Sequence, residues 1–191
     1  IKMSKKVILI SGKARSGKDT LARVLKDYLK EQGKDVLITH YADSLKYICE
    51  TVFKWDGKKD EKGRQLLIDI GESVRKYNQN YWVDCLKSAI KGVERDSPSL
   101  SSNSVYIVAD CRYENEIMEM KEFSPLVIRV EREHQLFRNG LTLQQSLSKS
   151  ETELDSFSSF DITVHNDFKT VEEYKKYVQE VLAKEVLKWL T

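Results

Sequence analysis

The stretch at residues 12–20 constrains the fold more strongly than any other part of this chain. It places Gly12 and Gly17 five residues apart, with Lys18 directly after the second glycine. An apolar run at 7–10 precedes it, and an amphipathic stretch with apolar residues at helical spacing follows it. A strand, a glycine-containing turn and a helix in this order direct several backbone N–H groups and a lysine toward one anion. We therefore expect a phosphate-binding loop made of Gly12, Lys13, Ala14, Arg15, Ser16, Gly17, Lys18, Asp19 and Thr20.

One position departs from the usual pattern of such loops. The residue after Lys18 is normally a serine or threonine that binds Mg²⁺, whereas this chain has Asp19, with Thr20 one place later. A carboxylate could bind Mg²⁺ directly or through water, because that ion takes oxygen ligands and retains several waters. Asp19 could instead cap the helix, since Asp is favoured at that position. The sequence leaves both roles open.

The rest of the chain alternates short apolar runs with helical patterns. Runs at 36–39, 105–110, 125–130 and 161–166 read as further strands, short and apolar as in a buried parallel sheet. Between the second and third strands, roughly fifty residues read as helices. The pattern predicts an α/β fold, namely a P-loop NTPase with three α/β/α layers and a central parallel sheet.

Composition limits the class of protein. A length of 191 residues fits a single domain spanning 1–191, and 32 basic and 30 acidic residues nearly cancel to a net charge of +2. This balance argues against a nucleic-acid or membrane binder. Three scattered cysteines without a C-x-x-C pair are typical of reduced thiols, and no apolar run is long enough to span a membrane. We expect a cytoplasmic protein.

Charged residues outside the loop fit the needs of a small kinase. Phosphoryl transfer depends mostly on positioning and on neutralising charge, and arginine binds phosphate oxygens in pairs. The arginines at 15, 64, 75, 132 and 138 meet this need, although each of them could also be a solvated surface residue.

Asp110 ends a buried strand and could hold the Mg²⁺ hydration shell, or could pair with Arg112. Asp43 could accept a hydrogen bond from a second substrate, or cap a helix. The rings of Tyr81 and Trp82 could stack on a base, but we expect Trp82 in the core.

Several stretches, taken in order, resemble the phage and bacterial deoxynucleoside monophosphate kinase family. They are Ser11–Thr20, Ala42–Lys46, Tyr81–Val83, Asp110–Arg112 with Asn115–Ile117, Ser150–Asp155 and Asp161–Asn166. The likeness covers nearly the whole chain and includes Lys18-Asp19 in place of Lys-Ser. It implies ATP- and Mg²⁺-dependent phosphorylation of a deoxynucleoside monophosphate, with a helical substrate-binding insertion at 43–94 and a short lid at 132–150.

The same resemblance implies roles for individual residues. Lys18 and Arg15 would stabilise the transferred phosphoryl group, Arg132 and Arg138 would close over ATP, and Asn166 would lie near the adenine. Asp43, Lys46, Arg64 and Arg75 would face the monophosphate. From their positions in the sequence we also expect Asp110 and Arg112 on the acceptor side, and Asp19 and Asp110 to hold the metal. Two positions depart from the family's pattern: Lys149 stands where a histidine is expected, and Glu72 where a threonine is expected.

Two other interpretations remain open at this stage. The loop, the Asp-x-Arg element and the Ser-Glu element also resemble animal-type phosphomevalonate kinases, which would need cations but no base pocket. A nucleotide-binding regulator without an acceptor substrate is the third. We expect small-molecule nucleotides as partners, no nucleic acid or membrane, and a monomer or homodimer. The sequence does not indicate which base is accepted.

Overall fold

A five-stranded parallel sheet forms the centre of the computed structural model, which describes residues 6–96, 104–132 and 141–191. The strand order is β2-β3-β1-β4-β5, and every adjacent pair is parallel. The strands are β1 (Lys6–Ser11), β2 (Asp35–Thr39), β3 (Ser104–Cys111), β4 (Leu126–Glu131) and β5 (Ile162–His165). Each predicted strand is present within one or two residues. The three central strands, β1, β3 and β4, are mostly buried and read as continuous apolar runs, whereas the edge strands β2 and β5 are only partly buried.

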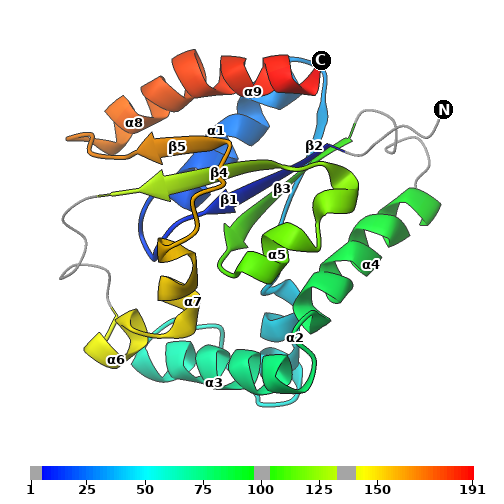
Figure 1. Ribbon diagram of the computed structural model, residues 1–191, viewed down its shortest axis with the longest axis vertical. Coiled ribbons are helices and arrows are strands. Elements are labelled where there is room, and N and C mark those ends of the chain that lie inside the picture. The colour runs from blue at the N-terminus through cyan, green and yellow to red at the C-terminus, as the bar shows by residue number, and fades with distance from the viewer. Residues whose placement is uncertain (1–5, 97–103, 133–140) are drawn as a thin grey trace.

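Helices cover both faces of the sheet (Figure 1). One face packs against α1 (Lys18–Glu31), α8 (Val171–Tyr177), the π-helical turn η4 (Val178–Leu182) and α9 (Ala183–Leu190). The other face packs against α4 (Tyr81–Asp96) and α5 (Glu114–Met118), through residues such as Val83, Leu86 and Ile117. These layers confirm the predicted three-layer α/β/α fold of the P-loop NTPase class.

A helical segment between β2 and β3 builds a second, smaller core. It contains α2 (Asp43–Thr51), α3 (Glu61–Tyr77) and α4. Leu45, Cys49 and Trp82 are buried here, with Trp82 only 2% exposed, so the expectation of a core tryptophan is confirmed. Helix α3 lies away from the sheet, beside α6 (Leu143–Ser146) and α7 (Lys149–Thr152) (Figure 1). Gln145 Nε2 donates to the carbonyl of Glu61 at 3.1 Å and thereby joins α6 to the start of α3.

Two short 3-10 segments complete the described elements, η2 (Lys121–Phe123) and η3 (Glu153–Asp155). At the start of α8, the Thr170 side chain caps the helix by accepting a hydrogen bond from the N–H of Glu173. Among the described residues, no helix is both long and apolar enough to cross a membrane.

Candidate functional site

The loop between β1 and α1 has the backbone conformation that its two glycines allow. Gly12 has φ 151° and Gly17 has φ 108°, in the region that side chains disfavour. A Cβ atom at Gly12 would lie 2.5 Å from the carbonyl oxygen of Val130. One at Gly17 would lie 2.5 Å from Nδ2 of Asn166. Both positions therefore require glycine, and the loop curls between β4 and the segment after β5.

Lys18 is the buried cation of this loop. Its side chain is in the first turn of α1, and Nζ donates to the carbonyl of Lys13 at 2.7 Å. Burial, followed by the nearby charge of Arg112, lowers the pKa of Lys18 to about 7. The ammonium is thus poorly solvated by the protein and would gain from contact with an anionic ligand.

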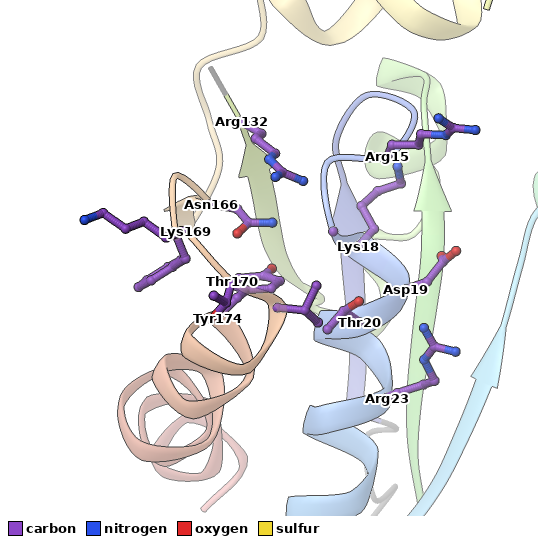
Figure 2. A pocket seen from close by; sticks show the side chains of 13 residues that line it. Arg15, Lys18, Asp19, Thr20, Arg23, Arg132, Asn166, Lys169, Thr170 and Tyr174 are labelled. Carbon is purple, nitrogen blue, oxygen red and sulfur yellow. The ribbon is translucent and has the colours of Figure 1, made fainter. Parts of the chain in front are cut away.

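A cavity of about 300 Å³ lies on one side of the loop (Figure 2). Its walls come from the start of α1, the end of β4 and the segment leading into α8, with Arg132, Asn166, Phe168 and Tyr174 among them. Asn166 is buried and donates from Nδ2 to the carbonyl of Ser16 at 2.8 Å, so it also fixes the loop. Arg132 extends toward this cavity (Figure 2). Arg138, predicted to act with Arg132, lies outside the described residues.

A larger cavity of about 760 Å³ lies on the other side of the loop. It extends from the loop along α3 and α2, and reaches the carboxyl end of β3. Four residues border both cavities, namely Arg15, Lys18, Asp19 and Arg23. Five of the six predicted acceptor residues line the larger cavity, namely Lys46, Arg64, Arg75, Asp110 and Arg112, whereas Asp43 is not among its lining residues. The structure therefore brings together residues that lie up to 66 positions apart in the chain, from 46 to 112.

Asp110 has different partners from those considered in the sequence. Its two carboxylate oxygens accept hydrogen bonds from the backbone N–H groups of Tyr41, at 2.8 Å, and Ala42, at 3.0 Å. The suggested pairing with Arg112 is wrong, because Arg112 pairs with Glu151, its Nη1 lying 2.5 Å from Oε1. Asp110 thus holds the turn between β2 and α2 against the end of β3.

The helix-cap alternatives for two other aspartates are also wrong. The cap position of α1 is Gly17, and Asp19 lies in the first turn with an exposed side chain. Asp43 does not cap α2, whose cap position is Ala42. Asp43 Oδ2 instead accepts from the backbone N–H of His40 at 2.9 Å, and Oδ1 lies 3.3 Å from Nζ of Lys46. Burial acts to raise the pKa of Asp43, but His40 and Lys46 outweigh it and lower this pKa to about 2.

The oxygen ligands around the loop fit a Mg²⁺ ion whose coordination shell is completed by substrate phosphates and water. In the described part of the chain, no group of three or more His, Cys, Asp or Glu side chains could form a metal cage. Mg²⁺ in kinase sites needs only one or two carboxylates plus phosphates and water. Asp19 borders both cavities, and its exposed carboxylate could take this role. Asp110 already accepts two amide hydrogen bonds, so it would contact the ion through water.

Arg75, like Arg112, is paired with a carboxylate of the chain. Its Nη2 lies 2.8 Å from Oε1 of the buried Glu116, and its guanidinium stacks 3.7 Å from the centroid of the Tyr113 ring. Arg64 and Arg75 are eleven residues apart on α3, about 16 Å along its axis. The sequence pattern gave no sign of this ion pair, because its partners are 41 residues apart.

Two contacts within this site were missed by reasoning from the sequence. Glu151 Oε2 accepts from the N–H of Ala14, in the phosphate-binding loop, at 2.9 Å. Tyr113 donates its hydroxyl hydrogen to Glu72, and both residues line the larger cavity. Glu151 belongs to a stretch already quoted for its resemblance, which was the available signal. Glu72 stood out only as a departure from the expected threonine.

Solved structures and one family model are similar to this chain. Among solved structures, a shikimate kinase from Aquifex aeolicus matches at 15% identity with a TM-score of 0.47, covering 95% of this chain and 98% of that chain. An APS kinase from Mycobacterium tuberculosis matches at 10% identity with a TM-score of 0.44, covering 94% and 97%.

No curated protein matched the chain. The family model for phosphomevalonate kinase matches residues 10–125, which is more than half of the 191 residues. The match includes the phosphate-binding loop, the helical segment and β3, and it agrees with the second of the two resemblances. The deoxynucleoside monophosphate kinase resemblance is not confirmed by it. By this match, the chain belongs to the phosphomevalonate kinase family.

Proposed function

We propose that the protein transfers the γ-phosphoryl group of ATP to the phosphate of a nucleoside monophosphate, with Mg²⁺ as cofactor. The observation that carries this proposal is the pair of cavities that meet at Arg15, Lys18, Asp19 and Arg23. A donor nucleotide in the smaller cavity and an acceptor in the larger one would place their phosphates at the same four residues. Such positioning is the main requirement of phosphoryl transfer.

The distribution of charge in the larger cavity favours an acceptor with one anionic end. Desolvation, followed by the charge of Lys46 and with a contribution from Arg64, lowers the pKa of Lys59, so these three cations lie near one another. Asp19 and Asp110 act on the same group, which puts the cations at the loop end of the cavity. They would bind the acceptor phosphate there.

The opposite end of the cavity is neutral or acidic on balance. It contains Gly71, Glu72, Trp82 and Tyr113, and the charge of Arg75 is taken up by Glu116. A nucleoside monophosphate has a phosphate at one end and an uncharged base at the other, which matches this arrangement. A phosphomevalonate has a carboxylate at its far end, which would lie beside the carboxylate of Glu72, with Arg75, already paired with Glu116, as the neighbouring cation.

In the proposed reaction, the chain's residues position the two substrates and neutralise the charge of their phosphates. Lys18 and Arg15 would contact the transferred group, Asp19 would hold Mg²⁺, and Arg132 would cover the donor phosphates. Mg²⁺, when bound, neutralises phosphate charge. No general base is needed, because a monophosphate oxygen is already anionic at neutral pH. Asn166 and Tyr174 would border the adenine of the donor.

Phosphorylation of a phosphomevalonate is the second candidate, favoured by the family match. The test is ADP release in the presence of ATP and Mg²⁺, with each nucleoside monophosphate and with mevalonate 5-phosphate. Turnover of a nucleotide is expected; turnover of mevalonate 5-phosphate alone would replace the proposal with the second candidate.

Variants of α1 provide the matched control. Lys18→Met should reduce turnover by roughly three orders of magnitude or more, as expected for loss of a cation at the transferred group. Lys30→Met removes an exposed lysine from the other end of the same helix and should leave turnover unchanged. Equal rates in the two variants would contradict the proposed role of the loop.

A further inference from the structure

Resting on the proposed function, we propose that Glu72, Tyr113 and Arg75 form a guanine-reading subsite, so that the preferred acceptor is a guanine nucleotide. The three residues come from α3 and from the segment between β3 and α5, and all of them line the larger cavity. They lie at the end of that cavity remote from the cations that would bind the acceptor phosphate.

The separation along α3 suits a nucleotide. Arg64 and Glu72 are eight residues apart on one continuous helix, which corresponds to about 12 Å along its axis. Leu67, Ile68 and Gly71 line the cavity between them. An acceptor whose phosphate lies near Arg64 therefore crosses an apolar wall before it reaches Glu72. A sugar and a flat base fit that wall.

Glu72 and Tyr113 together present two adjacent acceptors. Tyr113 donates its only hydroxyl hydrogen to Oε1 of Glu72, so the tyrosine oxygen is left with lone pairs. Within the described ranges, the other carboxylate oxygen of Glu72 accepts no hydrogen bond. The contact is partly buried, which strengthens a charge-assisted hydrogen bond to the carboxylate.

Arg75 adds a donor beside these acceptors. Its Nη2 is taken by Glu116, and its stacking on the Tyr113 ring fixes the guanidinium. Nη1 lies 3.5 Å from the position that a Cβ of Gly71 would have, in the wall of the cavity. In the part of the chain that the structure describes, Nη1 donates no hydrogen bond.

The Arg75 donor beside the Glu72 and Tyr113 acceptors is complementary to the hydrogen-bonding edge of guanine. Guanine offers the O6 acceptor followed by the N1–H and N2–H donors. Adenine and cytosine offer one amino donor beside a ring-nitrogen acceptor, which would face a carboxylate. Thymine and uracil place a single N–H between two carbonyl oxygens, and one of these would also face Glu72. A site built to bond an N–H group discriminates strongly against an analogue that lacks it.

The experiment compares kcat/KM for dGMP and dIMP at saturating ATP, because the two differ only in the N2 amino group. We expect the wild type to prefer dGMP over dIMP by roughly tenfold or more, and over dTMP by more than that. Glu72→Gln keeps the bond from Tyr113 but presents an amide donor to the base. This variant should lower the dGMP/dIMP ratio by roughly tenfold, with the KM for ATP unchanged.

Asp69→Asn is the matched control, since it neutralises an exposed carboxylate on the same helix and should preserve the ratio. A purely structural role of Glu72 would lower activity toward all acceptors equally. That result, or a wild type that does not distinguish dGMP from dIMP, would overturn the guanine subsite while leaving the nucleotide kinase in place. Turnover of mevalonate 5-phosphate alone would overturn both.

Discussion

Glu151 holds the phosphate-binding loop through Ala14. One carboxylate oxygen accepts the backbone N–H of Ala14 at 2.9 Å, and the other lies 2.5 Å from Nη1 of Arg112. The side chain of Glu151 is only 10% exposed. It therefore connects α7 to the loop and to the end of β3.

Removing this carboxylate should destabilise the protein. Glu151→Ala leaves the guanidinium of Arg112 without its partner and the Ala14 N–H without an acceptor. We expect the free energy of unfolding to fall by about 2–4 kcal/mol. Urea denaturation measures this, and Glu180→Ala, which removes an exposed carboxylate 4.0 Å from Lys176, should cost less than about 1 kcal/mol. Similar losses in both variants would show that the contact with the loop contributes nothing.

Nucleotide binding should protonate Lys18. Its pKa of about 7 in the free protein leaves the amine mostly neutral at pH 8, and the charge of bound phosphates would raise that pKa. Binding of ATP at pH 8 should then take up close to one proton more in the wild type than in Lys18→Met, and less at pH 6. Calorimetry in buffers of different ionisation enthalpy measures this uptake. Equal proton uptake by both proteins at pH 8 would contradict the lowered pKa.

Gly17 should not tolerate a side chain. Gly17→Ala would bring Cβ to 2.5 Å from Nδ2 of Asn166 and 2.9 Å from the Tyr174 ring, at a φ that already favours glycine. We expect loss of ATP binding and a destabilisation of more than about 2 kcal/mol. Gly33→Ala also has a positive φ, of 75°, but nothing lies within 4 Å of its Cβ, so it should cost only about 1 kcal/mol. Thermal unfolding with and without ATP separates the two, and equal shifts would argue against the contact.

The buried Glu116 should make stability depend on pH. Burial raises the pKa of this carboxyl to about 7, although Arg75 acts in the opposite direction. Between about pH 4.5 and 7 the folded protein keeps a proton that the unfolded chain has lost. The contribution of Glu116 to the free energy of unfolding is therefore present below pH 4.5 and lost as pH rises through 7.

Unfolding in urea at pH 5 and pH 7.5 tests this expectation. The stability difference between wild type and Glu116→Gln should favour the wild type more at pH 5 than at pH 7.5. A difference that is the same at both pH values would mean that Glu116 is ionised throughout the range. Glu122→Gln, with its carboxylate near Lys87 on the surface, serves as the comparison.

Local signals allowed the strands, the loop and α1 to be predicted from the sequence. Apolar runs, two glycines and helical spacing are all properties of neighbouring residues. Trp82 was assigned to the core for the same reason, since helical spacing showed its buried side. The partners of Asp110 could not be predicted, because the N–H groups of Tyr41 and Ala42 that it binds are 69 and 68 residues away.

The ion-pair partner of Arg75 could not be predicted either. The sequence shows an arginine on a helix, but whether it is available to a phosphate depends on Glu116, which α5 brings to it. The same holds for Glu72. Its departure from the expected residue was visible, but its hydrogen bond from the Tyr113 hydroxyl was not, because the two residues are 41 positions apart.

The position of Arg15, Lys18, Asp19 and Arg23 between the two cavities has a kinetic consequence. The two cavities share only these four of their lining residues. With one substrate in each cavity, as proposed, we expect the two to bind in either order, and steady-state kinetics should follow a random sequential mechanism. A single molecule with two nucleosides joined by a chain of phosphates would occupy both cavities at once and compete with both substrates.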